Sequence, residues 1–155
     1  MIRLEIPGTL SHRDVALRTI SAACKLLASG AAKSDEKSWG EFRMHFVSAV
    51  SEAFNNIVIH GYRDRDLGTV RIEIDLGQSN MTVRMVDFGA SFDLTRVPVP
   101  DLAKLPESGL GIFIIRSFMD SVQYEPGQPN VLILNKSLYA PRKSDARLAA
   151  AGDGR

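Results

Sequence analysis

Two polar residues four positions apart, Glu52 and Asn56, could do chemistry together if they lie on one helix. Residues with this spacing diverge by only ~40° around a helix and lie about 6 Å apart along its axis. A carboxylate can accept a proton or orient a water, and an amide oxygen can bind Mg²⁺ without adding charge. Glutamate and asparagine are also common on an ordinary solvated helix face, and the pair alone favours that interpretation.

Two motifs that contain glycine follow later in the chain. In Asp87-Phe88-Gly89, the aspartate could accept a hydrogen bond from an exocyclic amine, and the glycine leaves room for a flat ring. Aspartate and glycine also favour a plain turn at the end of a strand. Gly109-Leu110-Gly111 could open a helix whose bare N–H groups bind phosphate, although a single Gly-x-Gly is a weak signal.

Helical periodicity predicts the elements that would position Glu52 and Asn56. Apolar residues recur every three to four positions from about 11 to 29 and again from about 38 to 60, and Gly61 supplies a stop for the second helix. Ser11 with Asp14, and Ser38 with Glu41, predict capping boxes at the two helix starts. Cys24 falls in the apolar stripe of the first helix, which indicates a core residue, and Trp39 is expected to pack near the start of the second.

Alternating apolar and polar residues predict the strands. Residues 2–6 form one, 70–76 and 81–87 form a hairpin, and 121–125 and 131–135 form a second hairpin. Residues 112–119 are apolar nearly all round, so their periodicity leaves helix and strand open. Residues 88–108 have no clean period and contain three prolines, which is typical of a functional lid or a disordered loop.

The composition excludes several classes of protein. The chain has 155 residues and a formal charge of +1, which argues against a general nucleic-acid binder. Its single cysteine excludes a disulfide framework and a zinc site of several thiolates. No stretch approaches the ~20 apolar residues that span a membrane. We therefore expect one cytoplasmic domain over 1–139, with no membrane or direct nucleic-acid contact, and a mobile tail over 140–155.

The order of the motifs carries more information than any one of them. A helix with Glu-x-x-x-Asn, a hairpin that ends in Asp-x-Gly, a long segment and then Gly-x-Gly resemble, over residues 38–137, the Bergerat-type ATP-binding fold of gyrase, Hsp90-type chaperones, histidine kinases and MutL-type repair proteins. Within that superfamily, residues 51–62 (SEAFNNIVIHGY) and 108–120 (SGLGIFIIRSFMD) are similar to the first and last boxes of the anti-sigma-factor serine kinases.

The resemblance implies a two-layer α/β sandwich, with helices on one face of a mostly antiparallel sheet and residues 112–119 helical. It also implies roles for the motif residues. Glu52 would be the general base for a protein serine and Asn56 would hold Mg²⁺. Asp87 would receive the adenine amine, with Gly89 beside the ring. Gly109, Leu110 and Gly111 would cradle the phosphates of ATP, and residues 88–108 would be the lid.

The family resemblance further implies a homodimer that binds a sigma factor and phosphorylates a serine on a small anti-sigma-factor antagonist. Two positions depart from the family pattern. Glu107 stands where some relatives have a basic residue, and Gln128-Pro129-Asn130 stands where Gly-Thr is frequent, so we hypothesise that Asn130 replaces the threonine contact. The alternative function is a non-catalytic ATP-binding module of the same partner-switching type. The length argues against a fragment of a gyrase-like or histidine-kinase-like machine.

Overall fold

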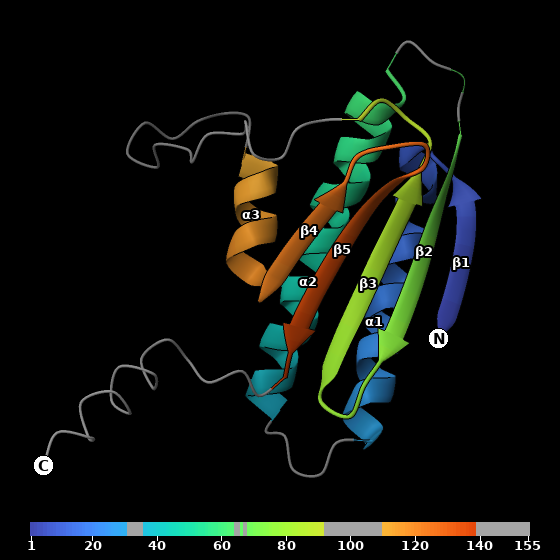
Figure 1. Ribbon diagram of the computed structural model, residues 1–155. Coiled ribbons are helices and arrows are strands. Elements are labelled where there is room, and N and C mark those ends of the chain that lie inside the picture. The colour runs from blue at the N-terminus through green and yellow to red at the C-terminus, as the bar shows by residue number, and fades with distance from the viewer. Residues whose placement is uncertain (31–35, 64–65, 67, 92–109, 139–155) are drawn as a thin grey trace, which may run out of the picture.

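The computed structural model describes residues 1–30, 36–63, 66, 68–91 and 110–138 (Figure 1). Its sheet has five strands in the order β1-β2-β3-β5-β4, and every neighbouring pair is antiparallel. The strands are β1 (Ile2–Pro7), β2 (Thr69–Leu76), β3 (Asn80–Asp87), β4 (Ser121–Glu125) and β5 (Asn130–Ser137). Both predicted hairpins are confirmed.

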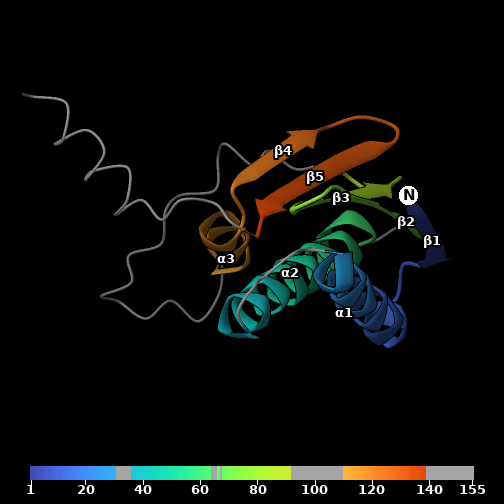
Figure 2. The ribbon, with the colours of Figure 1, turned by 90° about the horizontal axis from the view of Figure 1, so that it is seen from below.

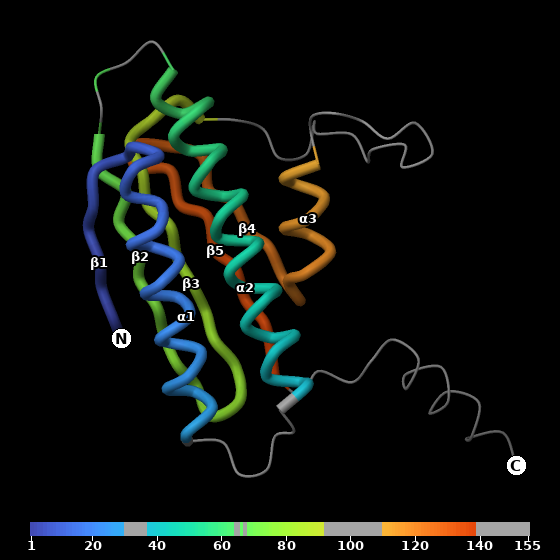
Figure 3. Tube along the Cα trace, turned by 180° about the vertical axis from the view of Figure 1, so that it is seen from behind, coloured from blue at the N-terminus to red at the C-terminus, as the bar shows by residue number. Residues whose placement is uncertain are grey.

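The helices form a second layer on one face of the sheet (Figure 2). They are α1 (Arg13–Gly30), α2 (Glu36–Asn56) and α3 (Leu110–Phe118). Seen from behind, α1 and α2 lie over the sheet, and α3 lies beside α2 toward the β4 edge (Figure 3). The expected two-layer α+β architecture is therefore confirmed, including the helix over most of 112–119.

The core lies between the two layers because alternate strand residues face the helices. Ile74 of β2 pairs with Val83 of β3, and Val83 pairs with Leu134 of β5, so one apolar row crosses three strands. All three side chains are fully buried. Each such side chain contributes roughly 1.5–3 kcal/mol by leaving water.

The predicted roles of Cys24 and Trp39 agree with the structure. Cys24 is buried in this core, and burial raises the pKa of its thiol to about 12. Trp39 packs edge-on against Phe42, with ring centroids 5.6 Å apart. Both residues therefore serve packing.

The two predicted capping boxes are wrong. A 3₁₀ turn over Leu10–His12 precedes α1, and Thr9 stands at its N-cap, with the Thr9 Oγ1 hydroxyl 2.8 Å from Ser11 Oγ and 2.7 Å from His12 Nδ1. Helix α2 begins at Glu36, so Ser38 lies inside it. In both cases the chain becomes helical earlier than the capping motif indicates.

Helix α2 does not end in a regular α-helical turn. It continues as a π-helical turn, η2 (Ile57–Gly61), closed by a bond from the Tyr62 N–H to the Ile57 carbonyl at 3.1 Å. A π turn widens the helix locally, and such turns are frequent at functional sites. The helix run still stops at Gly61, as predicted.

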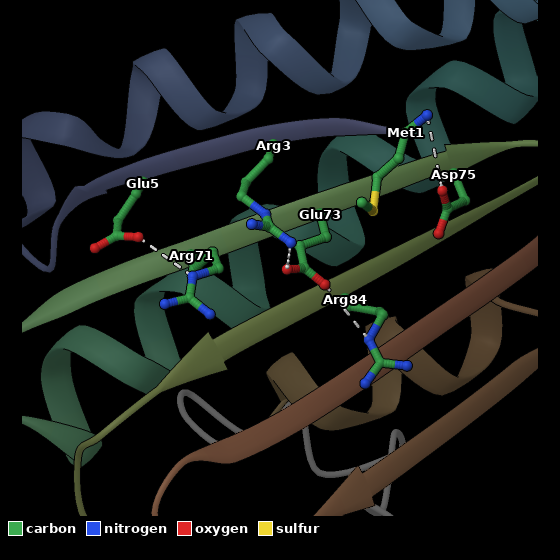
Figure 4. A network of polar contacts seen from close by, with 7 residues as sticks. All are labelled: Met1, Arg3, Glu5, Arg71, Glu73, Asp75 and Arg84. Carbon is green, nitrogen blue, oxygen red and sulfur yellow. Dashed lines mark hydrogen bonds and ion pairs between the residues drawn. The ribbon is translucent and has the colours of Figure 1, made fainter.

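The face of the sheet opposite the helices carries ion pairs (Figure 4). Arg3 of β1 pairs with Glu73 of β2 at 3.0 Å, and Arg84 of β3 approaches the other oxygen of Glu73 at 3.8 Å. Arg71 pairs with Glu5 at 3.2 Å. This open face is therefore polar on β1, β2 and β3.

Part of the predicted lid (92–108), together with Gly109 and the predicted tail, falls outside the described residues. Within the described ranges, no helix has the length and apolar character needed to cross a bilayer.

Candidate functional site

Helix α3 begins directly against the polar pair of α2. A Cβ atom on Gly111 would lie 2.9 Å from Glu52 Oε2 and 3.7 Å from both the Oδ1 and Nδ2 atoms of Asn56. Glu52 and Asn56 are both half-buried. The predicted grouping of Glu52, Asn56 and Gly111 is thus present, with Leu110 as the neighbouring first residue of α3. A side chain at position 111 would push against the Glu52 carboxylate.

A second contact fixes how α3 lies on α2. The ring of His45 stacks on Phe118, with centroids 4.4 Å apart and planes 23° from parallel. His45 precedes Glu52 by two turns in α2, and Phe118 follows Gly111 by two turns in α3. The two helices therefore run antiparallel, and the stack lies two turns from the contact of Gly111 with Glu52. Lys136 Nζ donates to the Phe118 carbonyl at 2.8 Å and holds the end of α3 on the sheet.

Asp87 occupies a position that the strand pattern would give to an apolar residue. Met81, Val83 and Met85 face the helices from β3, and Asp87 is the next residue in that series. Asp87 is only 3% exposed. Burial raises the pKa of the Asp87 carboxyl, while hydrogen bonds from Asn130 and from the Gly89 N–H act in the opposite direction.

The hydrogen bonds that Asp87 accepts from described residues both end on Oδ1. The Gly89 N–H donates at 2.8 Å, and the Asn130 amide donates through Nδ2 at 3.1 Å. Of the two carboxylate oxygens, Oδ2 is thereby the one left for a further donor.

The end of η2 packs directly on the segment after β3. The Ala90 N–H donates to the Gly61 carbonyl at 2.7 Å, and a Cβ on Gly89 would lie 2.6 Å from that same oxygen. A Cβ on Gly61 would lie 3.7 Å from Asp87 Oδ1. This close approach of two backbones explains why glycine stands at position 89, whereas a Cβ on Gly61 would make only ordinary van der Waals contacts. It also joins Asp87 and Gly89 to the helix that carries Asn56, about one turn earlier.

Tyr62 braces the same junction, and the sequence analysis did not single it out. Its ring is so close to Gly8 and Gly68 that a Cβ on either would lie 2.6 Å or less from ring atoms. Its hydroxyl donates to the Thr69 carbonyl at 2.9 Å and accepts from the Phe88 N–H at 3.3 Å. The only sequence signal was its place directly after Gly61 in the first box.

The site thus has two parts on one helix run. A buried carboxylate lies beside a glycine backbone at the η2 end, and a carboxylate and an amide lie against the first turn of α3. The N–H groups of a helix start favour anions. Among the residues with described placement, no three His, Cys, Asp or Glu side chains form a metal-binding group. Gly109 and Glu107 lie outside the described residues.

Comparison with known families identifies the class of protein that has this fold and site. The model of the histidine kinase-like ATPase domain family matches residues 11–136, which includes both parts of the site. The chain belongs to this family.

Individual relatives narrow the comparison. The chain is 32% identical over 105 residues to a protein of Oceanobacillus iheyensis named serine-protein kinase RsbW, an alignment that covers 63% of this chain and 66% of that relative. It is 33% identical over 87 residues to a protein of Clostridium beijerinckii named anti-sigma F factor, covering 54% of this chain and 61% of the relative. The chain thus spans just under two thirds of the length of these relatives.

The chain is also similar to a solved structure. It is the histidine kinase domain from the Erythrobacter litoralis EL346 blue-light activated histidine kinase, with a TM-score of 0.48 and 21% sequence identity. The match covers 74% of this chain and 50% of that chain.

Proposed function

We propose that this chain is an ATP-dependent protein serine kinase that also binds a sigma factor and phosphorylates the antagonist of that interaction. The observation that carries the proposal is the approach of Gly111 to Glu52 and Asn56, on the same helix run whose end contacts Asp87 and Gly89. The names of the relatives, serine-protein kinase and anti-sigma factor, support the same function.

In this proposal Asp87 receives the adenine. Its Oδ2 accepts a hydrogen bond from the exocyclic amine, while Oδ1 stays engaged by Gly89 and Asn130. Gly89 would flank the flat ring, and the absence of its Cβ lets the Gly61 backbone pack against the strand end. The burial of Asp87 strengthens such a bond, because water does not compete for the carboxylate.

The other part of the site holds the phosphates and the metal ion. The first turn of α3, with Leu110 and Gly111, offers N–H groups to phosphate oxygens, and Gly111 has no side chain to cover them beside Glu52. Gly109, the preceding residue in the sequence, would contribute to the same phosphate site. The amide oxygen of Asn56 binds Mg²⁺, which usually takes few protein ligands besides phosphates and waters. When bound, ATP would supply the phosphoryl group, and the Mg²⁺ ion would offset part of the negative charge of the phosphates.

Glu52 is the general base of the proposed reaction. Its Oε2 lies next to Gly111 of α3, and the carboxylate would accept the proton of a serine hydroxyl on the protein substrate. The antagonist carries that serine, and the sigma factor is the second partner. We further propose that residues 1–139 form one cytoplasmic kinase domain, that two copies form a homodimer, and that residues 140–155 are a mobile tail.

The proposal is tested by incubating the protein with labelled ATP and a small antagonist-type protein from the same organism, and by analysing that protein for phosphoserine. In Glu52→Gln, phosphate transfer should fall by roughly 10²–10⁴-fold while ADP affinity survives. The matched control is Glu41→Gln, an exposed glutamate about three turns earlier on nearly the same side of α2, which should retain transfer.

Two results would contradict parts of this proposal. Unchanged transfer in Glu52→Gln would remove Glu52 from the role of base. Tight ADP binding by the wild-type protein without phosphoserine would favour the alternative, a non-catalytic ATP-binding module. The departures at Glu107 and at Gln128-Pro129-Asn130 keep this second function in view.

A further inference from the structure

Asn130 is a buried polar residue directly opposite Asp87. It is the first residue of β5, and its Cα pairs with that of Asp87 in the sheet. Like Asp87, it continues an inward-facing apolar series, here Leu134 and Leu132, and it is only 1% exposed. A buried amide needs partners for all of its polar atoms, since each one left unpaired costs roughly 1–3 kcal/mol.

The partners of Asn130 fill its whole hydrogen-bonding capacity. Nδ2 donates to Asp87 Oδ1 at 3.1 Å and to the Gly89 carbonyl at 3.1 Å. Oδ1 accepts from the Gly127 N–H at 3.0 Å and from the Ser91 hydroxyl at 2.5 Å. An amide group has two donor and two acceptor positions, and all four are used.

The backbone partners also fix which way the amide points. The Gly127 N–H can only donate, so Oδ1 must face it, and the Gly89 carbonyl can only accept, so Nδ2 must face it. The donor that reaches Asp87 is therefore an N–H by necessity. With no free donor or acceptor, Asn130 cannot bind a ligand through its side chain and can act on one only through Asp87.

We propose that Asn130 is the positioning residue that sets the nucleobase selectivity of this site, by holding Asp87 as an ionised acceptor. The inference rests on the proposed nucleotide-binding function. A hydrogen bond donated to a carboxylate favours its charged form, and this one also directs Oδ1 away from the ligand, so that Oδ2 faces it. An ionised Oδ2 accepts from a 6-amino purine and repels the oxygen of a 6-oxo purine.

The test compares ADP with inosine diphosphate, which carries an oxygen in place of the 6-amino group. Isothermal titration calorimetry of the full chain with each nucleotide and Mg²⁺ gives an ADP-to-IDP affinity ratio. In Asn130→Ala this ratio should fall by about 10-fold or more, because ADP loses affinity while IDP does not. The control is Asn135→Ala, which removes another amide of β5, one that donates to Thr82 Oγ1 at 2.7 Å, and should leave the ratio unchanged.

Asn130→Asp adds a readout that a purely structural role would not move. The new carboxyl would face Asp87, and two adjacent carboxyls share one proton at low pH. That proton replaces the Nδ2 donor, so at about pH 6 the ratio should approach the wild-type value. Near pH 8 the proton leaves, the two charges repel, and the ratio should fall by about 10-fold or more. Among the described residues, Tyr62 is a titratable group that interacts electrostatically with Asp87. In the wild type the ratio should stay constant over this range.

Two outcomes overturn the inference and one overturns its premise. A wild-type ratio in folded Asn130→Ala, or a ratio in Asn130→Asp that does not change with pH, would contradict the role of Asn130. If Asn130→Ala fails to fold, the pH dependence of the affinity ratio in Asn130→Asp alone tests the role of Asn130. Absence of ADP binding by the folded wild-type protein would instead contradict the proposed function.

Discussion

The sheet carries two polar clusters, one on each face, and they differ in burial and in how strictly their hydrogen-bond partners are fixed. Asp87 and Asn130 face the helices, are 3% and 1% exposed, and are joined by hydrogen bonds whose partners are fixed by the backbone. Arg3, Glu73 and Arg84 face away from the helices, and the two arginine side chains are 56% and 41% exposed. Burial makes every partner of the first cluster necessary, while water can replace the partners of the second.

This difference distinguishes the candidate binding site around Asp87 from the solvent-exposed face of the sheet. The strand residues alternate, so a one-residue step along β3 takes the chain from Val86, which faces away from the helices, to Asp87, which faces them. A charged residue on the helix side is costly to desolvate, and its neighbours compensate with two directed donors. The ion pairs on the open face have no such constraint and match opposite charges in register, Arg3 with Glu73 and Glu73 with Arg84.

Gly89→Ala should break the buried cluster most severely. The new Cβ would meet the Gly61 carbonyl oxygen at 2.6 Å and its carbon at 2.7 Å, and backbone atoms cannot yield as a flexible side chain can. We expect the free energy of unfolding to fall by about 3 kcal/mol, measured by urea denaturation. In Gly40→Ala, where the Cβ would meet no described atom within 4 Å, stability should instead rise by up to about 1 kcal/mol. Equal effects of the two changes would contradict the packing described for Gly89.

His45 is intermediate in exposure between the buried Asp87–Asn130 cluster and the ion pairs of the open face. It is half-buried, and its Nδ1 atom is buried without a partner among the described residues. Burial and then Lys136 lower the pKa of His45 below the usual 6.5, while Glu41 and Asp120 oppose the shift. The unfolded chain therefore takes up a proton at this position before the folded chain does. The stability that His45 contributes is complete above about pH 6.5 and is lost as the pH falls toward its folded pKa.

This pH dependence is measured by urea denaturation between about pH 7.5 and 5.5. The wild-type protein should lose more stability on acidification than His45→Leu does. His60→Gln, at an exposed position in η2, is the control and should follow the wild type. An identical pH dependence in wild type and His45→Leu would contradict the environment described for His45.

Glu73→Gln should have the smallest effect. It removes the ion pairs with Arg3 and Arg84 on the open face, and pairs with such exposed partners contribute about 0–1 kcal/mol (Figure 4). The loss of unfolding free energy should stay below about 1 kcal/mol and should shrink further in high salt, since salt screens exposed charges. A loss as large as that of Gly89→Ala would mean that the open face is as tightly constrained as the buried cluster.

The elements that could be predicted from the sequence are those that local periodicity determines. Alternation located both hairpins, helical spacing located α1 and α2, and Gly61 marked the end of the helix run. The capping boxes failed at Ser11 and Ser38 because a cap contributes only about 1 kcal/mol and does not by itself fix where a helix begins. Ser11 lies in the 3₁₀ turn before α1, and Ser38 lies inside α2. Residues 112–119 gave no period because α3 is apolar on several sides, and only the family resemblance indicated a helix there.

The contacts within the site depend on register between distant segments. Asp87 and Asn130 meet because β5 pairs with β3, two strands that are not consecutive in sequence, so no local pattern could give their contact. The hypothesis that Asn130 replaces a threonine contact named this residue but could not supply the hydrogen-bond partners that the structure gives it. Tyr62 was missed because its role arises only from the approach of Gly8, Gly68 and Phe88 in space.

The central claim, a nucleotide site centred on Asp87, is tested most directly by calorimetry of Mg-ADP with Asp87→Asn. The Oδ1 atom of the new asparagine can still accept from Gly89 and Asn130, so unfolding free energy should change by less than about 1 kcal/mol. Its NH₂ group would stand where Oδ2 receives the adenine amine, and ADP affinity should fall by about 100-fold. Asp75→Asn, on the open face with a side chain 56% exposed, should bind ADP as the wild type does. Wild-type ADP affinity in a folded Asp87→Asn protein would contradict the account.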